Sequence, residues 1–424
     1  VGNFLSFDEP QSLSLLADVH AKERKREFSV ASVHLLKFAA IFGANAAGKS
    51  NVIKAMTFAH SLIKQGTDAI DNPQAYCRLR STNKEKASYF EFEIALRDRL
   101  FAYGFEVIIA KKTFTEEWLV ELSETEEHVL FSRDTHKKNF HYDKIFFDEK
   151  FGLALEQLKT NQNSLLLQGL KDSDFLGELY TWFDHLFLAS PTGSLIGYSA
   201  IPIEDWNQIS KAIAHFATGI TEIQFSRVSE KVVVALVPME YQTQFTEDCA
   251  QARKKGISYR LQIESRLFLM QPEGKTLQFS EAGFAHQGAL FTYDEESDGT
   301  RRLLALLSVL VTLQKGSVAI IDEIDRSLHP KLTLQFVKNY LELARTRDLQ
   351  LVVTTHESLL LNLELLRRDE IFFVEKNREG ASIIYPFDQF QRQFDTHLEQ
   401  AYLSGRYGGI PHFGNLYLPE EDEV

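Results

Sequence analysis

The chain has 424 residues, of which 25% are charged and 44% hydrophobic, which is typical of a globular protein with two or three domains. The formal net charge of −13 argues against a broadly basic nucleic-acid surface, although local basic patches stay open. The two cysteines, Cys77 and Cys249, exclude a disulfide framework and a cysteine-based zinc site, and they favour a reducing cytoplasm. No apolar run reaches the roughly eighteen residues of a membrane span, so we expect a cytoplasmic protein without a membrane partner.

The first part of the chain predicts short β-strands that lead into a loop of small residues. Residues 2–7 and 12–16 carry Phe and Leu at strand-like spacing, and residues 28–40 continue with alternating apolar positions. The apolar run ends at Phe42, and a helical stretch opens at Asn51. The loop between them therefore joins a strand to a helix.

This loop matches the P-loop pattern G-x-x-x-x-G-K-[ST] in the strand–loop–helix context that the pattern requires. Backbone N–H groups of such a loop point at nucleotide phosphates. We expect Lys49 to reach the β- and γ-phosphates of ATP and to act in catalysis, and Ser50 to ligate Mg²⁺. The expected nucleotide-binding residues are Gly43, Ala44, Asn45, Ala46, Ala47, Gly48, Lys49, Ser50 and Asn51.

Beyond the P-loop helix, the sequence predicts a β meander followed by helices. Four runs rich in β-branched and aromatic residues, at 89–96, 101–109, 118–122 and 129–132, indicate antiparallel strands. Helical spacing follows from 146 to 182 and from 206 to 216, and strand-like runs return at 231–237, 259–269 and 276–279. We therefore expect an inserted helical subdomain over residues 133–225.

A turn with the sequence Glu296-Ser-Asp-Gly-Thr300 precedes an apolar helix at 303–313. Ser297 offers a hydroxyl, Gly299 allows close backbone approach, and the helix start leaves N–H groups unpaired, which together can bind an anion. We include Ser297 and Gly299 among the nucleotide-binding residues. An ordinary helix cap is the alternative.

The apolar strand Val318-Ala-Ile-Ile321 ends in the acidic pair Asp322-Glu323. Functional groups of parallel sheets lie at the carboxyl ends of the strands. We expect Asp322 to hold Mg²⁺, and Glu323 to orient or deprotonate the attacking water. A helix over 331–345 and a second apolar strand over 349–355 follow, and His356 ends that strand. We expect His356 to donate a hydrogen bond to the γ-phosphate, although a lone histidine after a strand is more often structural.

Together, these motifs resemble the layout of ABC-type ATPases, in particular their soluble SMC- and RecF-like branch. The chain is most similar to stand-alone bacterial ATPases of anti-phage systems: abortive-infection and RloA-like proteins, the PARIS ATPase AriA and OLD-type ATPase domains. Residues 2–7 and the late stretch Tyr402-Leu-Ser-Gly-Arg-Tyr-Gly-Gly-Ile-Pro411 strengthen this narrower match. Two features depart from the common pattern: Ala46 stands where many members have Gly, and the signature is Ser-Asp-Gly-Thr instead of Ser-Gly-Gly-Gln. No Q-loop glutamine can be assigned.

The resemblance implies an α/β ABC-type ATPase head with a mixed, largely parallel sheet, the antiparallel meander and the inserted helical part. It also implies a homodimer that sandwiches ATP head to tail, or a higher oligomer, acting as the sensor and scaffold of an abortive-infection system. A separate effector, a Toprim-like or HNH nuclease or a toxin, would be the partner, and a phage protein or DNA the trigger.

Two other functions stay open from the sequence. A RecF- or SMC-like DNA repair or chromosome-maintenance ATPase is the main alternative, although no heptad repeat predicts coiled-coil arms. A transporter ATPase subunit is the third. For the domain organisation, we expect an N-terminal ATPase part at 1–132, the inserted part at 133–225, a C-terminal ATPase part at 226–411 and an acidic tail at 412–424.

Overall fold

The computed structural model describes residues 1–18, 26–123, 126–171, 174–189, 198–203, 206–214, 216, 218–313, 316–390 and 398–410. The chain divides into two compact units, one formed by residues 1–185 with 352–424 and the other by residues 186–351. The expected acidic tail at 412–424 lies outside the described residues.

The first unit contains the strand that leads into the P-loop. This strand, β3 (Phe38–Phe42), is buried along its whole length. It pairs in parallel with β18 (Ile371–Lys376), which pairs antiparallel with β19 (Ser382–Pro386). β17 (Gln350–Thr355) is the next strand on the other side of β3. A hairpin of β1 (Glu27–Val30) and β2 (Val33–Leu36) precedes β3, whereas residues 2–7 and 16 form only isolated bridges instead of the predicted strands.

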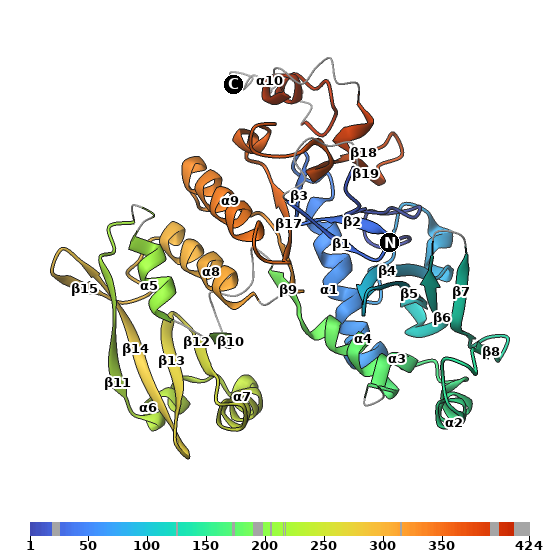
Figure 1. Cartoon of the computed structure of the whole chain (residues 1–424), viewed down its shortest axis with the longest axis horizontal. Helices are drawn as coiled ribbons and strands as arrows, with labels where there is room; N and C mark the ends of the chain where they lie inside the picture. The colour runs from blue at the N-terminus through green and yellow to red at the C-terminus, as the bar shows by residue number, and fades with distance from the viewer. Residues whose placement is uncertain are drawn as a thin grey trace, which may run out of the picture. The chain divides into compact units, whose positions relative to one another are not determined.

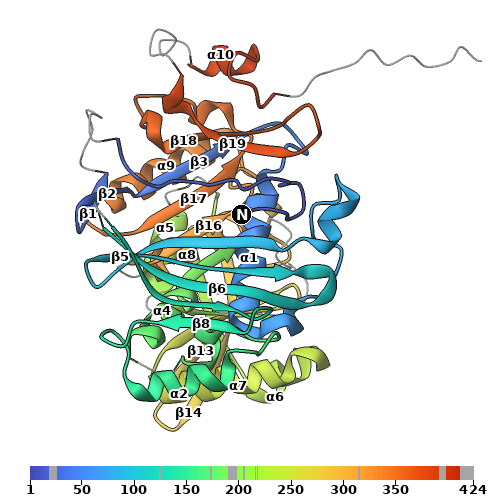
Figure 2. The same ribbon diagram turned by 90° about the vertical axis from the view of Figure 1, so that its right-hand side faces the viewer.

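The predicted meander is confirmed as a five-stranded antiparallel sheet in the first unit. Its strands are β4 (Ser88–Leu96), β5 (Arg99–Ile108), β6 (Thr113–Leu122), β7 (Glu127–Asp134) and β8 (Asn139–Tyr142). Figure 2 shows β5, β6 and β8 running alongside one another. Aromatic rings from this sheet share one apolar core with the P-loop helix α1 (Lys49–Gln65), so the meander supports that helix.

The first unit also contains the helices α2 (Glu149–Leu158), α3 (Leu166–Gly169) and α4 (Asp174–Asp184), which follow the meander in the chain. Figure 1 shows α1 running from the end of β3 toward α3 and α4. A fully buried ion pair lies within the meander, where Arg133 Nη2 of β7 is 2.8 Å from Glu117 Oε2 of β6. Arg133 Nη1 ties the helical part to the meander, because it donates to the backbone oxygen of Leu158 at 2.9 Å. Glu117 also accepts hydrogen bonds from the backbone N–H groups of Leu166 and Leu167 at α3. Residues 133–185 belong to the first unit and residues 186–225 to the second, and the inserted subdomain over 133–225 stays a prediction.

The second unit contains a largely antiparallel sheet in the order β10-β12-β13-β14-β11, with β15 beside β14. Its strands are β10 (Tyr198–Ile203), β11 (Glu222–Val228), β12 (Ser258–Ile263), β13 (Arg266–Glu273), β14 (Thr276–His286) and β15 (Ala289–Phe291). Helices α6 (Glu230–Leu236) and α7 (Gln242–Lys255) pack against one face through Val233, Phe245 and Cys249 (Figure 1). The predicted strand at 231–237 is wrong, because this valine run forms α6.

The remaining elements of the second unit carry the predicted signature and acidic motifs. β16 (Val318–Ile321) pairs in parallel with β9 (Leu186–Ala189). The helices are α5 (Trp206–Ala214), α8 (Asp298–Thr312) and α9 (Pro330–Ala344). The chain then returns along β17 to the first unit, which ends with α10 (Leu398–Leu403). The predicted α/β fold class is confirmed, with parallel strand pairs in a mixed sheet alongside antiparallel sheets. Within the described part of the chain, no helix is long and apolar enough to cross a membrane.

Candidate functional site

The P-loop begins where the buried strand β3 ends. Gly43 and Gly48 are glycines for steric reasons: a Cβ on Gly43 would lie 2.4 Å from the carbonyl oxygen of Val374, and a Cβ on Gly48 would lie 2.2 Å from Ser382 Oγ. Gly48 also has a φ of 116°, which side chains rarely adopt. Ala46 takes the left-handed region with a φ of 62°, so this alanine has a backbone conformation that glycine adopts more readily. The alanine at position 46 therefore does not prevent this left-handed backbone conformation.

The crest and the base of the loop differ in exposure. Asn45 and Ala46 at the crest are exposed, whereas Ala47, Gly48 and Lys49 at the base are buried. A hydrogen bond of 3.2 Å from Ala47 N to Ala44 O closes the loop on itself. The exposed crest leaves the loop open to a ligand from solvent.

Lys49 folds back over the loop that precedes it. Its Nζ donates hydrogen bonds of 2.7 Å to Gly43 O and 3.0 Å to Ala44 O. Nδ1 of His356, from the end of β17, lies 3.4 Å from the same Nζ. Since an ammonium can only donate, this contact requires Nδ1 to accept and leaves the proton of a neutral His356 on Nε2. The structure thus brings together two predicted residues that are far apart in the sequence.

Two serines that no sequence motif indicated form hydrogen bonds around the base of the P-loop. Ser382 Oγ donates to Ala47 O at 2.6 Å and lies 2.7 Å from Ser6 Oγ. Ser6 Oγ in turn accepts from Asn51 Nδ2 at 2.7 Å, which links the N-terminal stretch to the start of α1. Ser6 belongs to the 2–7 stretch that carries the family resemblance. Ser382 follows no recognisable motif, so no signal in the sequence could have identified it.

The predicted signature turn lies at the start of α8 in the second unit. Ser297 is the N-cap of that helix, and its Oγ accepts from Thr300 N at 3.1 Å. A Cβ on Gly299 would lie 2.7 Å from the carbonyl oxygen of Ser327, so the loop after the acidic motif covers this glycine. The structure therefore shows the capping role of Ser297, and its role in nucleotide binding stays a prediction.

The acidic pair follows β16, as predicted, and its two members have different surroundings. Asp322 is 3% exposed, whereas the Glu323 side chain is 33% exposed, with a backbone φ of 46°. Arg302, which sequence analysis missed, donates from Nη2 to the backbone oxygens of both residues at 3.0 Å. Burial lowers the pKa of the Arg302 guanidinium. Arg302 thereby joins the signature helix to the acidic turn within one unit.

The predicted site residues thus fall into two groups, one in each unit. Gly43 to Asn51 and His356 belong to the first, and Ser297, Gly299, Asp322 and Glu323 to the second. Among the described residues, no three His, Cys, Asp or Glu side chains are grouped to hold a metal ion. This is compatible with Mg²⁺, which is commonly bound by one or two protein groups together with substrate phosphates.

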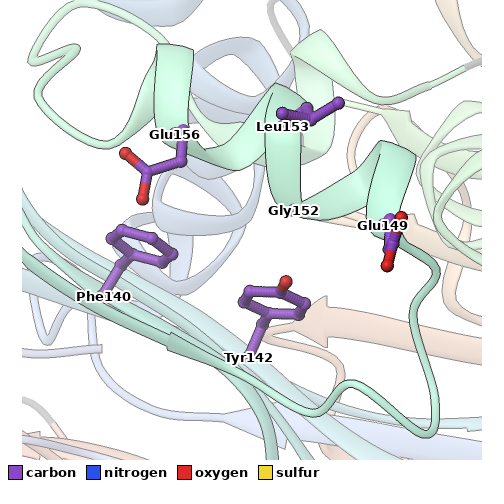
Figure 3. A pocket seen from close by; sticks show the side chains of 6 residues that line it. All are labelled: Phe140, Tyr142, Glu149, Gly152, Leu153 and Glu156. Carbon is purple, nitrogen blue, oxygen red and sulfur yellow. The ribbon is translucent and has the colours of Figure 1, made fainter.

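A cavity of about 310 Å³ lies in the first unit between β8 and α2. Figure 3 shows the rings of Phe140 and Tyr142 facing helix α2, which carries Glu149 and Glu156. None of the predicted site residues lines this cavity. The candidate site is therefore built on the loop and the turns described above.

Comparison with known proteins identifies one family model. The model, described as AAA domain, putative AbiEii toxin, Type IV TA system, matches residues 38–362. This range includes the P-loop, the signature turn, the acidic pair and His356. No curated protein matches the chain.

The solved structures similar to the chain include three SMC heads. The SMC head bound to the C-terminal winged-helix domain of ScpA is 14% identical, with 84% of this chain and 94% of that chain covered and a TM-score of 0.40. An SMC head with an extended coiled coil, bound to the C-terminal domain of ScpA derived from Pyrococcus furiosus, is 15% identical, with coverages of 84% and 92% and a TM-score of 0.38. The SMC head from Thermotoga maritima is 12% identical, with coverages of 91% and 96% and a TM-score of 0.33.

Proposed function

The chain belongs to the family of AAA domains described as putative AbiEii toxin of type IV TA systems, and from this premise we propose that it binds and hydrolyses ATP. The observation that supports this most directly is the placement of Lys49. Its Nζ is held by the oxygens of Gly43 and Ala44 beneath an exposed loop crest. A fixed cation at the start of a helix is suited to the β- and γ-phosphates.

The two side chains proposed to bind a metal ion carry a hydroxyl group and a carboxylate. Ser50, in the first turn of α1, and Asp322, at the end of β16, provide the oxygen ligands that Mg²⁺ prefers. When bound, Mg²⁺ neutralises charge on the phosphate oxygens. Ser50 and Asp322 would hold the metal, and Lys49 would orient the phosphates beside it.

Hydrolysis is proposed to use Glu323 and His356. The Glu323 carboxylate is partly exposed, so it can accept a proton from a water molecule that attacks the γ-phosphate. His356 is exposed, and the tautomer that accepts from Lys49 presents Nε2–H as a donor. That donor would stabilise the charge on the γ-phosphate oxygens as the bond breaks.

The active site is proposed to be shared between two copies of the chain. Ser297 and Gly299 would contact the γ-phosphate of the nucleotide on a neighbouring copy, as the ABC-type layout implies. One two-fold axis would then create two equivalent sites, in a homodimer or as a building block of a higher oligomer. ATP would stabilise this assembly by mass action.

The biological role that we propose is that of sensor and scaffold in a bacterial anti-phage system of the abortive-infection kind. The description of the family as a toxin of type IV TA systems supports a two-component system of this kind. In this proposal ATP-driven assembly controls a separate effector, either a toxin or a Toprim-like or HNH nuclease. A phage protein or DNA would provide the trigger.

The biochemical part of the proposal is tested with purified protein and labelled ATP. Lys49→Ala should abolish or strongly weaken ATP binding, because it removes the cation at the β- and γ-phosphates. Lys54→Ala is the matched control, since Lys54 is an exposed lysine of the same helix. Glu323→Gln should retain ATP binding and slow hydrolysis by a factor on the order of 10² to 10⁴. Equal loss of binding in Lys49→Ala and Lys54→Ala, or no binding by the wild type, would contradict the proposal.

A further inference from the structure

The segment at residues 398–410 packs against the end of the P-loop strand. The ring of Tyr402 stacks on Phe373 of β18, with centroids 5.4 Å apart, and meets Phe42 of β3 edge-on at 6.2 Å. Tyr402 is 7% exposed, so this contact is part of the core of the first unit. Because Phe42 immediately precedes Gly43, the segment lies beside the start of the P-loop.

Two glycines lie in contact where this segment meets the P-loop. A Cβ on Gly409 would lie 3.4 Å from the Cα of Gly43, and Gly409 has a φ of 64°, where a side chain is strained. On its other side Gly43 meets the carbonyl of Val374, which a Cβ on Gly43 would approach to 2.4 Å. The first residue of the P-loop is therefore enclosed between β18 and residues 407–410, which we call the 407–410 turn.

Side chains from β18, β19 and α10 hold this turn in place. Gly409 N donates to Glu375 Oε2 at 3.1 Å, and the Tyr402 hydroxyl donates to Gly409 O at 3.1 Å. The Tyr385 hydroxyl donates to Tyr407 O at 2.6 Å. Burial and then the charge of Glu375 raise the pKa of Tyr385, so its hydroxyl remains a donor at neutral pH. The turn is thus fixed by three hydrogen bonds to side chains.

The Gly43 peptide is also the anchor of Lys49. Its carbonyl accepts the 2.7 Å hydrogen bond from Lys49 Nζ. We propose that the 407–410 turn is a positioning element of the nucleotide site, which fixes the Gly43 carbonyl and through it the cation that meets the β- and γ-phosphates. The inference rests on the proposed binding of ATP. Its consequence is that a change at Gly409 alters nucleotide binding although this residue belongs to no P-loop motif.

The test compares two glycines with the same backbone strain. Gly274, at the β13–β14 hairpin, has a φ of 64° like Gly409, but no atom lies within 4 Å of its added Cβ. We expect Gly409→Ala to raise the ATP Kd about tenfold over Gly274→Ala, because small displacements of a positioning group have effects of this size. The ADP Kd should rise less, since ADP lacks the γ-phosphate. The thermal melting temperatures of both variants report their folding.

A second pair of variants separates positioning from a general loss of structure. Glu375→Ala removes the acceptor for Gly409 N and should weaken ATP binding, whereas Glu375→Gln keeps an acceptor oxygen and should restore it. Binding of ATP by wild type with equal Kd values for Gly409→Ala and Gly274→Ala would overturn the inference and leave the proposed function intact. Equal effects of Glu375→Ala and Glu375→Gln would also overturn it. Absence of binding by wild type would instead reject the proposed function.

Discussion

The guanidinium of Arg302 donates a hydrogen bond of 3.0 Å to the backbone carbonyl oxygen of Glu323, and the same Nη2 reaches the oxygen of Asp322. Glu323 has a φ of 46°, a conformation that costs about 1–2 kcal/mol for a residue with a side chain. Arg302 therefore stabilises a strained turn that contains Glu323, the proposed general base. Since Arg302 lies on α8, near its N-cap Ser297, a displacement of the signature turn would also reach the acidic pair.

We expect Arg302→Ala to lower kcat for ATP hydrolysis about tenfold to hundredfold through displacement of Glu323. The ATP Kd should change little, because Arg302 does not contact the P-loop lysine in the proposed mechanism. Loss of these two hydrogen bonds should reduce the free energy of unfolding by about 1–3 kcal/mol. Arg302→Lys keeps a charged donor and should recover part of kcat. The control is Arg253→Ala, which removes an exposed pair with Glu230 in the same unit; a similar kcat in this control and in Arg302→Ala would contradict the prediction.

A second prediction concerns the buried pair of Arg133 and Glu117. Arg133→Ala should reduce the free energy of unfolding by about 3–5 kcal/mol, because it leaves the Glu117 carboxylate buried without its cation. Chemical denaturation monitored by fluorescence measures this change. Arg99→Ala, which breaks a surface pair with Glu121 on the same sheet, should cost no more than about 1 kcal/mol. Equal destabilisation by the two substitutions would show that the buried pair has no special role.

Local patterns predicted much of the fold and of the candidate site. The strands of the meander, the P-loop helix and the strands that precede Asp322 and His356 lie where hydrophobic periodicity and motif context placed them. These features depend on neighbours in the sequence. Ser382 and Arg302 were missed because their roles arise from contacts that only folding creates: one supports the Ala47 carbonyl and the other the acidic turn.

The error in the expected secondary structure also has a physical cause. The valine run in α6 favours a strand by propensity, but burial of Val233 against the sheet of the second unit stabilises a helix instead. The contacts of residues 158–167 with the meander gave no signal either, because they depend on Arg133, which donates to Leu158 O, and on Glu117, which accepts from Leu166 N. A buried ion pair between distant positions gives no periodic signal.

A third prediction uses the backbone of Ala46. Ala46→Gly should leave the free energy of unfolding unchanged or raise it by up to about 1 kcal/mol, because glycine relieves strain at a φ of 62° while it increases the entropy of the unfolded chain. Ala59→Gly, inside α1, should instead cost about 1 kcal/mol or more. Thermal unfolding of the two variants measures the difference. A loss of stability in Ala46→Gly as large as in Ala59→Gly would contradict the observed loop conformation.

The last prediction tests whether two chains share each active site. Ser297 caps α8, so the informative substitution is Ser297→Asp: aspartate is also a good N-cap, but its charge would repel a phosphate at this turn. We expect Lys49→Ala and Ser297→Asp each to be inactive alone. In a heterodimer of the two, one composite site carries both substitutions and the other carries neither.

Mixing the two variants should therefore restore ATP hydrolysis, because each heterodimer has one intact site of its two. The recovered activity should follow the fraction of heterodimers in the mixture. Differently tagged chains, purified in two steps, establish that heterodimers have formed, and melting temperatures establish that Ser297→Asp folds like wild type. A mixture of Lys49→Ala with Glu323→Gln is the control. If Glu323 acts on the nucleotide of its own chain, as we propose, the Lys49→Ala chain has no competent P-loop and the Glu323→Gln chain has no base, so activity should not return. Recovery in that mixture, or no recovery with Ser297→Asp despite verified heterodimers, would contradict the proposed arrangement of the shared site.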